Sequence, residues 1–214
     1  SLINPELGKK TTHISHGVVR LPTGKMSSRS GNIITGEWLL DEAKKLLNNK
    51  YPEMTEDILE KVAAGSVKYA LLKGSIGHDI EFDFEESINI QGNSGPYLQY
   101  TFVRTQSVLK KVKKFNTTKY YTFSRKLSLE LEELSLLRTL YRFQEVIEEA
   151  GEKYAPNLLC NYLFDLAQKF NLFYQKHKIL QSRTEDFRIG LTNATGIVIK
   201  KGLKLLGIQV PEKM

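Results

Sequence analysis

The sequence predicts a mostly α-helical protein, in which a bundle of helices follows a smaller segment of mixed helix and strand. After residue 97, hydrophobic residues recur at steps of three and four, which is the period of an amphipathic helix. Only one segment, THISHGVVR at residues 12–20, is typical of a strand. With 41% hydrophobic and 26% charged residues among 214, the chain is well able to bury a core.

The elements before the bundle follow from short-range signals. The expected strand at 12–20 leads into a basic, serine-rich loop, LPTGKMSSRSGNIIT, at residues 21–35. A helix is expected over residues 37–48, where the apolar residues have helical spacing and Tyr-Pro follows soon after. Thr55 is a suitable N-cap for the next helix, which has two acidic residues in its first turn and extends to about residue 72.

The second half of the chain is expected to be helical throughout. Residues 74–96 contain four glycines and the acidic stretch HDIEFDFEE, and they are expected to form a connector. Gly207 is placed as a glycine that ends the last helix would be. There is no internal repeat. The periodicity predicts four helices, at residues 97–114, 128–149, 156–177 and 185–205.

Charge and composition restrict the class of partner. A formal charge of +7 and a pI of about 9.3 favour a polyanion, most often nucleic acid. The single cysteine, Cys160, excludes an internal disulfide and a multi-cysteine zinc site, and it suits a reducing, cytoplasmic location. No run approaches the ~18 apolar residues of a membrane span, and the residues at the N-terminus do not have the pattern of a signal peptide. The chain begins at Ser1, as a fragment of a longer protein would.

The basic loop has the chemistry to hold a phosphate chain. Lys25 and Arg29 supply positive charge, and the hydroxyls of Ser27 and Ser28 supply hydrogen bonds. It is not a Walker loop, because the GxxxxGK[ST] pattern is absent. Composition alone leaves open the alternative of a solvated surface loop between a strand and a helix.

The order of these residues carries a resemblance. K-M-S-S-R, between a strand and a helix, resembles the KMSKS signature loop of class I aminoacyl-tRNA synthetases. HISHGVVRLPTGKMSSRSG, SVKYALLKGSIGHDIEFDFEESINIQGNSGPYLQYTFVRTQSVLKK and GLKLLGIQVPEKM together resemble the C-terminal portion of an arginyl-tRNA synthetase, over essentially the whole chain. The resemblance implies that residues 1–80 are the C-terminal remnant of a class I Rossmann-type catalytic domain. It implies that residues 81–214 form an all-helical anticodon-binding domain.

The resemblance also implies an activity, an arginine–tRNA ligase that uses ATP to activate arginine and transfers it to tRNA-Arg. In that family the signature loop stabilises the transition state at the α-phosphate by positioned cations. This assigns a catalytic role to Lys25, Ser27, Ser28 and Arg29, although serine stands at position 28 where the signature has its second lysine. ATP is the substrate and brings Mg²⁺ with it, and neither a tightly bound cofactor nor a metal site in this chain is expected.

The same resemblance implies contacts to the nucleotide from Lys25 and Met26, and from His16 and Gly17 on the preceding strand. A histidine on a half-buried strand is also commonly just packed and hydrogen-bonded, and that alternative stays open for His16. His78 has only a structural role to offer. His177 continues an apolar stripe, so a core position is favoured for it.

Tyrosines and an arginine are the candidate RNA contacts. Loop bases are captured by stacking on aromatic side chains, while lysine and arginine hold phosphates. Tyr97 and Tyr100 are about one turn apart, and Arg104 extends the same helix face. The resemblance places Tyr97, Tyr100 and the terminal Met214 near the anticodon loop, and Tyr174 is a further candidate. The alternative is that tyrosines at helical spacing belong to the core.

Two groups of lysines either contact phosphates or form solvated faces. The first group follows the helix that begins near residue 97, and the second lies on the last helix. They are Lys110, Lys111, Lys113 and Lys114, and Lys200, Lys201 and Lys204.

One absence limits the expected activity of this chain. Class I chemistry also needs the HIGH signature, and no H-x-G-H occurs here. We therefore expect the chain to bind tRNA but not to activate arginine alone, and we expect a monomer. Three alternatives remain: an autonomous tRNA-binding module, a cysteinyl-type synthetase fragment and a nucleotidyltransferase of the same superfamily. The single cysteine and the long helical C-terminal part disfavour the last two.

Overall fold

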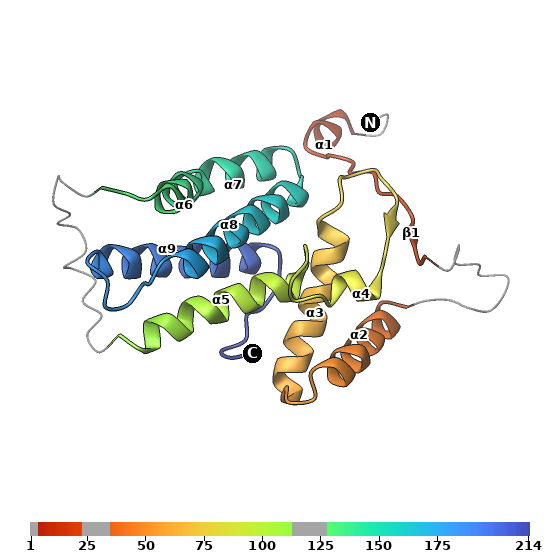
Figure 1. The fold of residues 1–214 in the computed structure, drawn as a ribbon. Helices are drawn as coiled ribbons and strands as arrows, with labels where there is room; N and C mark the ends of the chain where they lie inside the picture. The colour runs from red at the N-terminus through yellow and green to blue at the C-terminus, as the bar shows by residue number, and fades with distance from the viewer. Residues whose placement is uncertain (1–3, 23–34, 113–127) are drawn as a thin grey trace.

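The computed structural model describes residues 4–22, 35–112 and 128–214, and most of them are helical (Figure 1). The mostly α-helical class is confirmed. The first half contains α1 (Pro5–Lys9), β1 (Val19–Arg20), α2 (Gly36–Lys50), α3 (Glu56–Leu72), β2 (Ile80–Glu81) and α4 (Phe84–Ser87). The second half contains α5 (Gly95–Lys110), α6 (Leu131–Tyr141), α7 (Phe143–Glu152), α8 (Pro156–Lys176) and α9 (Glu185–Leu205).

The strand expected over residues 12–20 is wrong in extent, because β1 comprises only Val19 and Arg20. β1 pairs in parallel with β2, with Val19 opposite Ile80, and α2 and α3 lie in the crossover between them. A strand persists only where its backbone has a partner, and here the ladder extends from the carbonyl of Val18 to that of Arg20. The connector at 74–96 is likewise more ordered than expected, since it contains β2 and α4.

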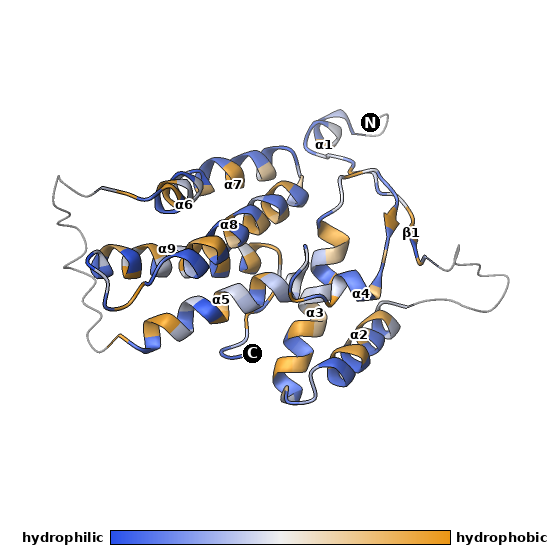
Figure 2. Cartoon of the chain, viewed as in Figure 1, coloured by the Kyte–Doolittle hydropathy of each residue, from blue (hydrophilic) through white to orange (hydrophobic). Residues whose placement is uncertain are grey.

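Helix α3 lies between α2 and α5 (Figure 1), and it contributes residues to two hydrophobic clusters. Leu59 and Val62 belong to the smaller cluster together with residues of α2 such as Leu47. Nearer the C-terminal end of α3, Tyr69 belongs to the larger cluster, which is formed mainly by α5, α8 and α9. Hydrophobic and hydrophilic residues alternate along the helices, as expected for helices that each bury one face (Figure 2).

The single helix expected over 128–149 is wrong, because the structure divides it into α6 and α7 at Arg142. In a continuous helix the carbonyl of Thr139 would accept the backbone N–H of Phe143. Here it accepts the N–H of Arg142 at 3.1 Å and the buried hydroxyl of Tyr162 at 2.9 Å instead. A side chain from α8 therefore takes the acceptor that would have continued the helix.

The end of the last helix is confirmed. Gly207 has a φ of +69°, which favours glycine, and the N–H of Ile208 reaches the carbonyl of Leu203 at 2.8 Å. The chain reverses there, and residues 208–214, which we call the C-terminal tail, return toward α5 and α3 (Figure 1). Within the described ranges, no helix is long and apolar enough to cross a membrane.

Candidate RNA-binding site

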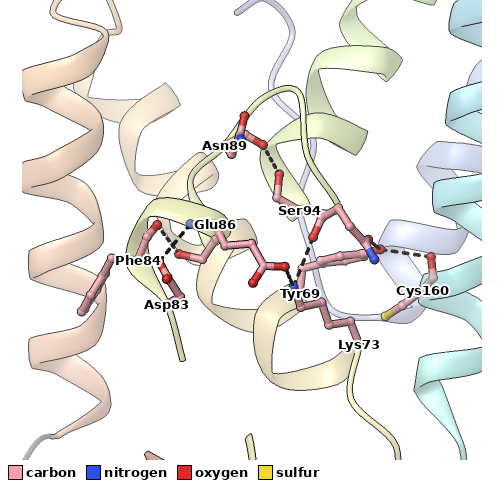
Figure 3. Close-up of polar contacts among 10 residues, drawn as sticks. Tyr69, Lys73, Asp83, Phe84, Glu86, Asn89, Ser94 and Cys160 are labelled. Carbon is pink, nitrogen blue, oxygen red and sulfur yellow. Dashed lines mark hydrogen bonds and ion pairs between the residues drawn. The ribbon is translucent and has the colours of Figure 1, made fainter. Parts of the chain in front are cut away.

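The start of α5 is fixed by the connector that precedes it (Figure 3). The side chain of Ser94 is the N-cap, since it accepts the backbone N–H of Tyr97 at 3.1 Å. The same hydroxyl donates to the backbone carbonyl of Asn89. Together these bonds set where α5 begins, and so they set the direction in which Tyr97 and Tyr100 leave the helix.

A group of polar contacts near Ser94 joins the connector to α3 and α8 (Figure 3). The hydroxyl of Tyr69 on α3 donates to the side-chain oxygen of Asn93 at 2.7 Å and lies 3.1 Å from the carbonyl of Cys160 on α8. Lys73 pairs with Glu86 at 2.5 Å. Burial raises the pKa of the Tyr69 phenol well above its usual range, with a smaller contribution from Cys160. Tyr69 is therefore a neutral donor that holds these contacts together.

Four of the predicted RNA contacts, Tyr97, Tyr100, Arg104 and Tyr174, lie together on α5 and α8. The guanidinium carbon of Arg104 is 4.9 Å from the ring centroid of Tyr100 and 5.0 Å from that of Tyr174. One arginine thus contacts the rings of tyrosines from two helices, and its Nη2 also donates to the Tyr100 hydroxyl at 3.3 Å. Tyr174 is 40% exposed and Tyr100 partly exposed, so both rings reach the surface.

Asn171 on α8 joins the members of this group, although it is not among the residues predicted from the sequence. Its side-chain oxygen accepts from Nη1 of Arg104 at 2.5 Å. Its amide nitrogen donates to the hydroxyls of Tyr97, at 2.9 Å, and Thr101, at 3.0 Å. The signal was present as an asparagine three residues before Tyr174 within an apolar helix face. We call Tyr97, Tyr100, Arg104, Asn171 and Tyr174 the Tyr–Arg cluster.

The cluster offers two kinds of surface to a ligand. Partly exposed rings provide faces on which bases can stack, and the planar guanidinium provides charge and directional donors. Tyr97 is more constrained, because its hydroxyl accepts from Asn171 and its ring lies edge-on to Phe164 with centroids 5.5 Å apart. Tyr100 and Tyr174 are therefore better placed for stacking than Tyr97.

Met214 is not part of the network of contacts in the Tyr–Arg cluster. It is partly buried and packs against both hydrophobic clusters, and the hydrogen bonds and ring contacts found among the described residues do not connect it to the Tyr–Arg cluster. His177, for which a core position was favoured, is partly buried and hydrogen-bonds to Glu132 at 3.1 Å.

The nucleotide contacts expected near the N-terminus are described only in part. His16 is exposed, and its Nδ1 lies 3.1 Å from the carbonyl of Gly17. A Cβ at Gly17 would stand 2.2 Å from the carbonyl oxygen of His78, so glycine is needed for the close approach of these two segments. Lys25, Met26, Ser27, Ser28 and Arg29 lie outside the described residues.

Neither a metal site nor a reactive thiol was found in the part of the chain that the structure describes. No group of three or more His, Cys, Asp or Glu side chains there is arranged to hold an ion. Cys160 is fully buried, and burial raises the pKa of its thiol to about 12. It stays protonated near neutral pH and is a packing residue.

Comparison with known proteins shows the family to which the helical half of the chain belongs. Residues 98–214, which include most of the helical half, match the DALR anticodon binding domain. The chain therefore belongs to the DALR anticodon binding domain family. It also resembles the C-terminal portion of arginyl-tRNA synthetases, in agreement with the motifs.

Individual relatives support the same placement along the chain. The sequence is 34% identical to an arginine–tRNA ligase of Parabacteroides distasonis and 37% identical to one of Clostridium beijerinckii, with 98% and 100% of this chain covered. A structure of Thermus thermophilus arginyl-tRNA synthetase superposes with a TM-score of 0.85 at 26% identity, over 98% of this chain and 37% of that one. The chain spans 37% and 39% of the lengths of these two ligases.

Proposed function

We propose that this chain is the C-terminal part of an arginine–tRNA ligase, and that its helical half binds the anticodon loop of tRNA-Arg at the Tyr–Arg cluster. The observation that carries the proposal is Arg104, which lies against the rings of Tyr100 and Tyr174 at 4.9 and 5.0 Å. Unpaired loop bases stack on Tyr100 and Tyr174, while Arg104 meets the backbone or a base edge. The tail with Met214 is the remaining candidate contact.

In the complete enzyme, residues 1–80 take part in arginine activation, and residues 81–214 form the tRNA-binding domain. The charges of Lys25 and Arg29, with the hydroxyls of Ser27 and Ser28, stabilise the negative charge that develops on the phosphates of ATP. Met26, His16 and Gly17 contact the nucleotide. Mg²⁺ enters with ATP. The cytoplasmic location and the monomeric state remain predictions.

The experiment measures binding of this chain to a tRNA-Arg transcript and to the same transcript with an altered anticodon loop, at two salt concentrations. Stacking contributes ~1–3 kcal/mol per base, so Tyr100→Ala should weaken binding of the matched transcript about 5- to 150-fold. Tyr100→Phe keeps the ring and should lose far less. Tyr141→Ala is the matched control, because Tyr141 lies on α6 outside the cluster and is 89% exposed.

Equal affinity for both transcripts, or a Tyr100→Ala variant that folds and binds as the wild type does, would contradict the proposal for the cluster. A second assay separates the ligase from an autonomous tRNA-binding module. In the complete enzyme, Lys25→Ala should abolish arginine-dependent ATP–pyrophosphate exchange. The 214-residue chain by itself should show no exchange.

A further inference from the structure

A basic cavity lies on the side of α5 that faces away from the Tyr–Arg cluster. Its volume is about 650 Å³, and α3, α5, α9 and the C-terminal tail enclose it. Phe102, Gln106 and Lys110 line it at intervals of four residues along α5. At about 100° per residue, Phe102 is about 160° around the helix from Tyr100, so the cavity and the cluster occupy different faces. We call it the lysine cavity.

Four lysines from three helices line this cavity: Lys61, Lys110, Lys200 and Lys204. Lys61 is neutralised by Asp57, at 2.6 Å on the same helix. The other three have no carboxylate within ion-pair distance among the described residues, and Lys200 lies over the ring of Phe102, 5.9 Å from its centroid. One acidic residue in the lining, Glu212, opposes them. The lining therefore keeps an excess of positive charge that nothing described in the fold neutralises.

The wall opposite α9 is held in place by defined hydrogen bonds. The fully buried amide of Gln99 donates to the carbonyl of Lys61 at 2.9 Å and to that of Gln209 at 2.7 Å. Lys68 donates to the carbonyl of Gly207 at 2.7 Å. The bond to Gln209 attaches the C-terminal tail to α5, and the bond to Gly207 holds the residue just before the tail against α3, so the cavity is a built feature of the fold.

We propose that the lysine cavity binds phosphate groups of the RNA strand whose bases meet the Tyr–Arg cluster. This deepens the proposed function. Flexible ammonium groups on several elements suit a phosphate chain, because they act as point charges without a preference for one base. The cavity has a volume of about 650 Å³ and three lysines without a carboxylate partner among the described residues, which is more space and more positive charge than one small anion needs. The cavity supplies affinity without sequence information, and the cluster supplies the discrimination between anticodons.

The test uses two anticodon stem-loop RNAs, one with the matched anticodon and one altered, and the variant Lys200→Gln/Lys204→Gln. The control is Lys45→Gln/Lys153→Gln, which removes the same charge from an exposed lysine on α2 and another just after α7, where they pair with Glu42 and Glu149. The cavity variant should bind both RNAs about tenfold more weakly, with the ratio of the two affinities unchanged. Loss of two phosphate contacts should make the slope of log K against log salt shallower by about 1.4.

Equal affinities and salt slopes in the cavity and control variants would overturn the proposal. The wild type could fail to distinguish the two RNAs while the cavity variant still binds both more weakly. That result would contradict anticodon recognition by the Tyr–Arg cluster but support phosphate binding in the lysine cavity. If the cavity variant binds as the wild type does while Tyr100→Ala still reduces discrimination between the RNAs, the proposal for the lysine cavity is contradicted and the proposal for the Tyr–Arg cluster is supported.

A footprint on the wild-type protein does not depend on how the variants fold. Amine acetylation read by mass spectrometry should show that the matched RNA protects Lys200 and Lys204 but leaves Lys45 reactive. Pyrophosphate alone is the comparison ligand. Protection by pyrophosphate and not by RNA would overturn the proposal in favour of a small-anion site, and no protection by RNA would also overturn it.

Discussion

Gly95 at the start of α5 lies directly against Gly65 in the middle of α3. A Cβ built on Gly95 would stand 2.2 Å from the carbonyl oxygen of Gly65, a distance that real side chains do not adopt. The close contact requires that residue 95 has no side chain, and a Cβ on Gly65 would separately stand 2.7 Å from the side chain of Gln99 on α5. The contact holds the beginning of α5, and with it the first tyrosine of the Tyr–Arg cluster, against the layer formed by α3.

Gly95→Ala should therefore destabilise the protein strongly, because backbone atoms cannot move aside as a flexible side chain can. Overpacking of a buried contact costs about 1–3 kcal/mol, and a clash with a carbonyl belongs at the upper end. The control is Gly151→Ala on α7, where an added Cβ meets nothing within 4 Å and helix propensity should add ~0.5–1 kcal/mol of stability. Urea unfolding measures both, and a Gly95→Ala variant as stable as the wild type would contradict the close contact.

Arg104→Lys should weaken RNA binding although it preserves the charge. Lysine lacks the planar guanidinium that contacts both tyrosine rings, and interactions of this kind contribute ~0.5–2 kcal/mol. A loss of about 2- to 30-fold in affinity for the matched stem-loop is expected. Arg138→Lys on the exposed face of α6 should bind as the wild type does. Equal affinities of the two variants would show that Arg104 acts as a charge alone.

Arg188→Met should be among the more destabilising single substitutions. Nε of Arg188 is 2.7 Å from the carboxylate of Glu133, whose side chain is only 1% exposed. Removing one partner leaves a buried charge uncompensated, at a cost of about 3–5 kcal/mol. Arg142→Met, which breaks an exposed pair with Glu145, should cost at most ~1 kcal/mol. Similar urea concentrations at the unfolding midpoints of the two variants would contradict the expectation that the buried ion pair contributes more to stability than the exposed one.

Stability should decrease in acid partly through Glu132. Hydrogen bonds from Lys176 and His177 lower the pKa of this carboxyl to about 2 from its ordinary value of 4.5. A group whose pKa is lower in the folded state stabilises the protein fully above the ordinary value and loses that contribution as the pH falls toward the folded one. The free energy of unfolding should therefore decrease between about pH 5 and 2, and less so in Glu132→Gln. Glu148→Gln should follow the wild type, and identical profiles for all three proteins would exclude a role for Glu132.

Elements whose limits depend on local periodicity could be predicted from the sequence. Elements whose limits depend on contacts with residues distant in the sequence could not. The last helix was predicted as Glu185–Leu205, including the glycine after it, because both signals are local. The break at Arg142 was missed because it depends on the hydroxyl of Tyr162, twenty-three residues away from Thr139. The strand at 12–20 was overextended for the same reason, since its length is set by the residues of β2 opposite it.

The candidate site shows the same division. One helix turn brings Tyr100 and Arg104 together, so the sequence could place them on one face. That Arg104 also meets Tyr174, and that Asn171 joins both helices, depends on how α8 packs on α5. Periodicity says which face of a helix is buried but not which residue of another helix it meets. The lysine cavity was missed for this reason, although three of its lysines had been noted as charged groups.

Helix α3 belongs to both hydrophobic clusters, and this determines how the molecule should come apart. Leu59 and Val62 lie in one cluster and Tyr69 in the other, so neither core can lose its structure without exposing residues of the helix they share. We therefore expect one cooperative melting transition, with coincident curves from different spectroscopic probes, although the chain has two hydrophobic clusters. RNA bound at α5 should raise the melting temperature of the whole molecule, and amides of α2 should be protected together with those of the bundle.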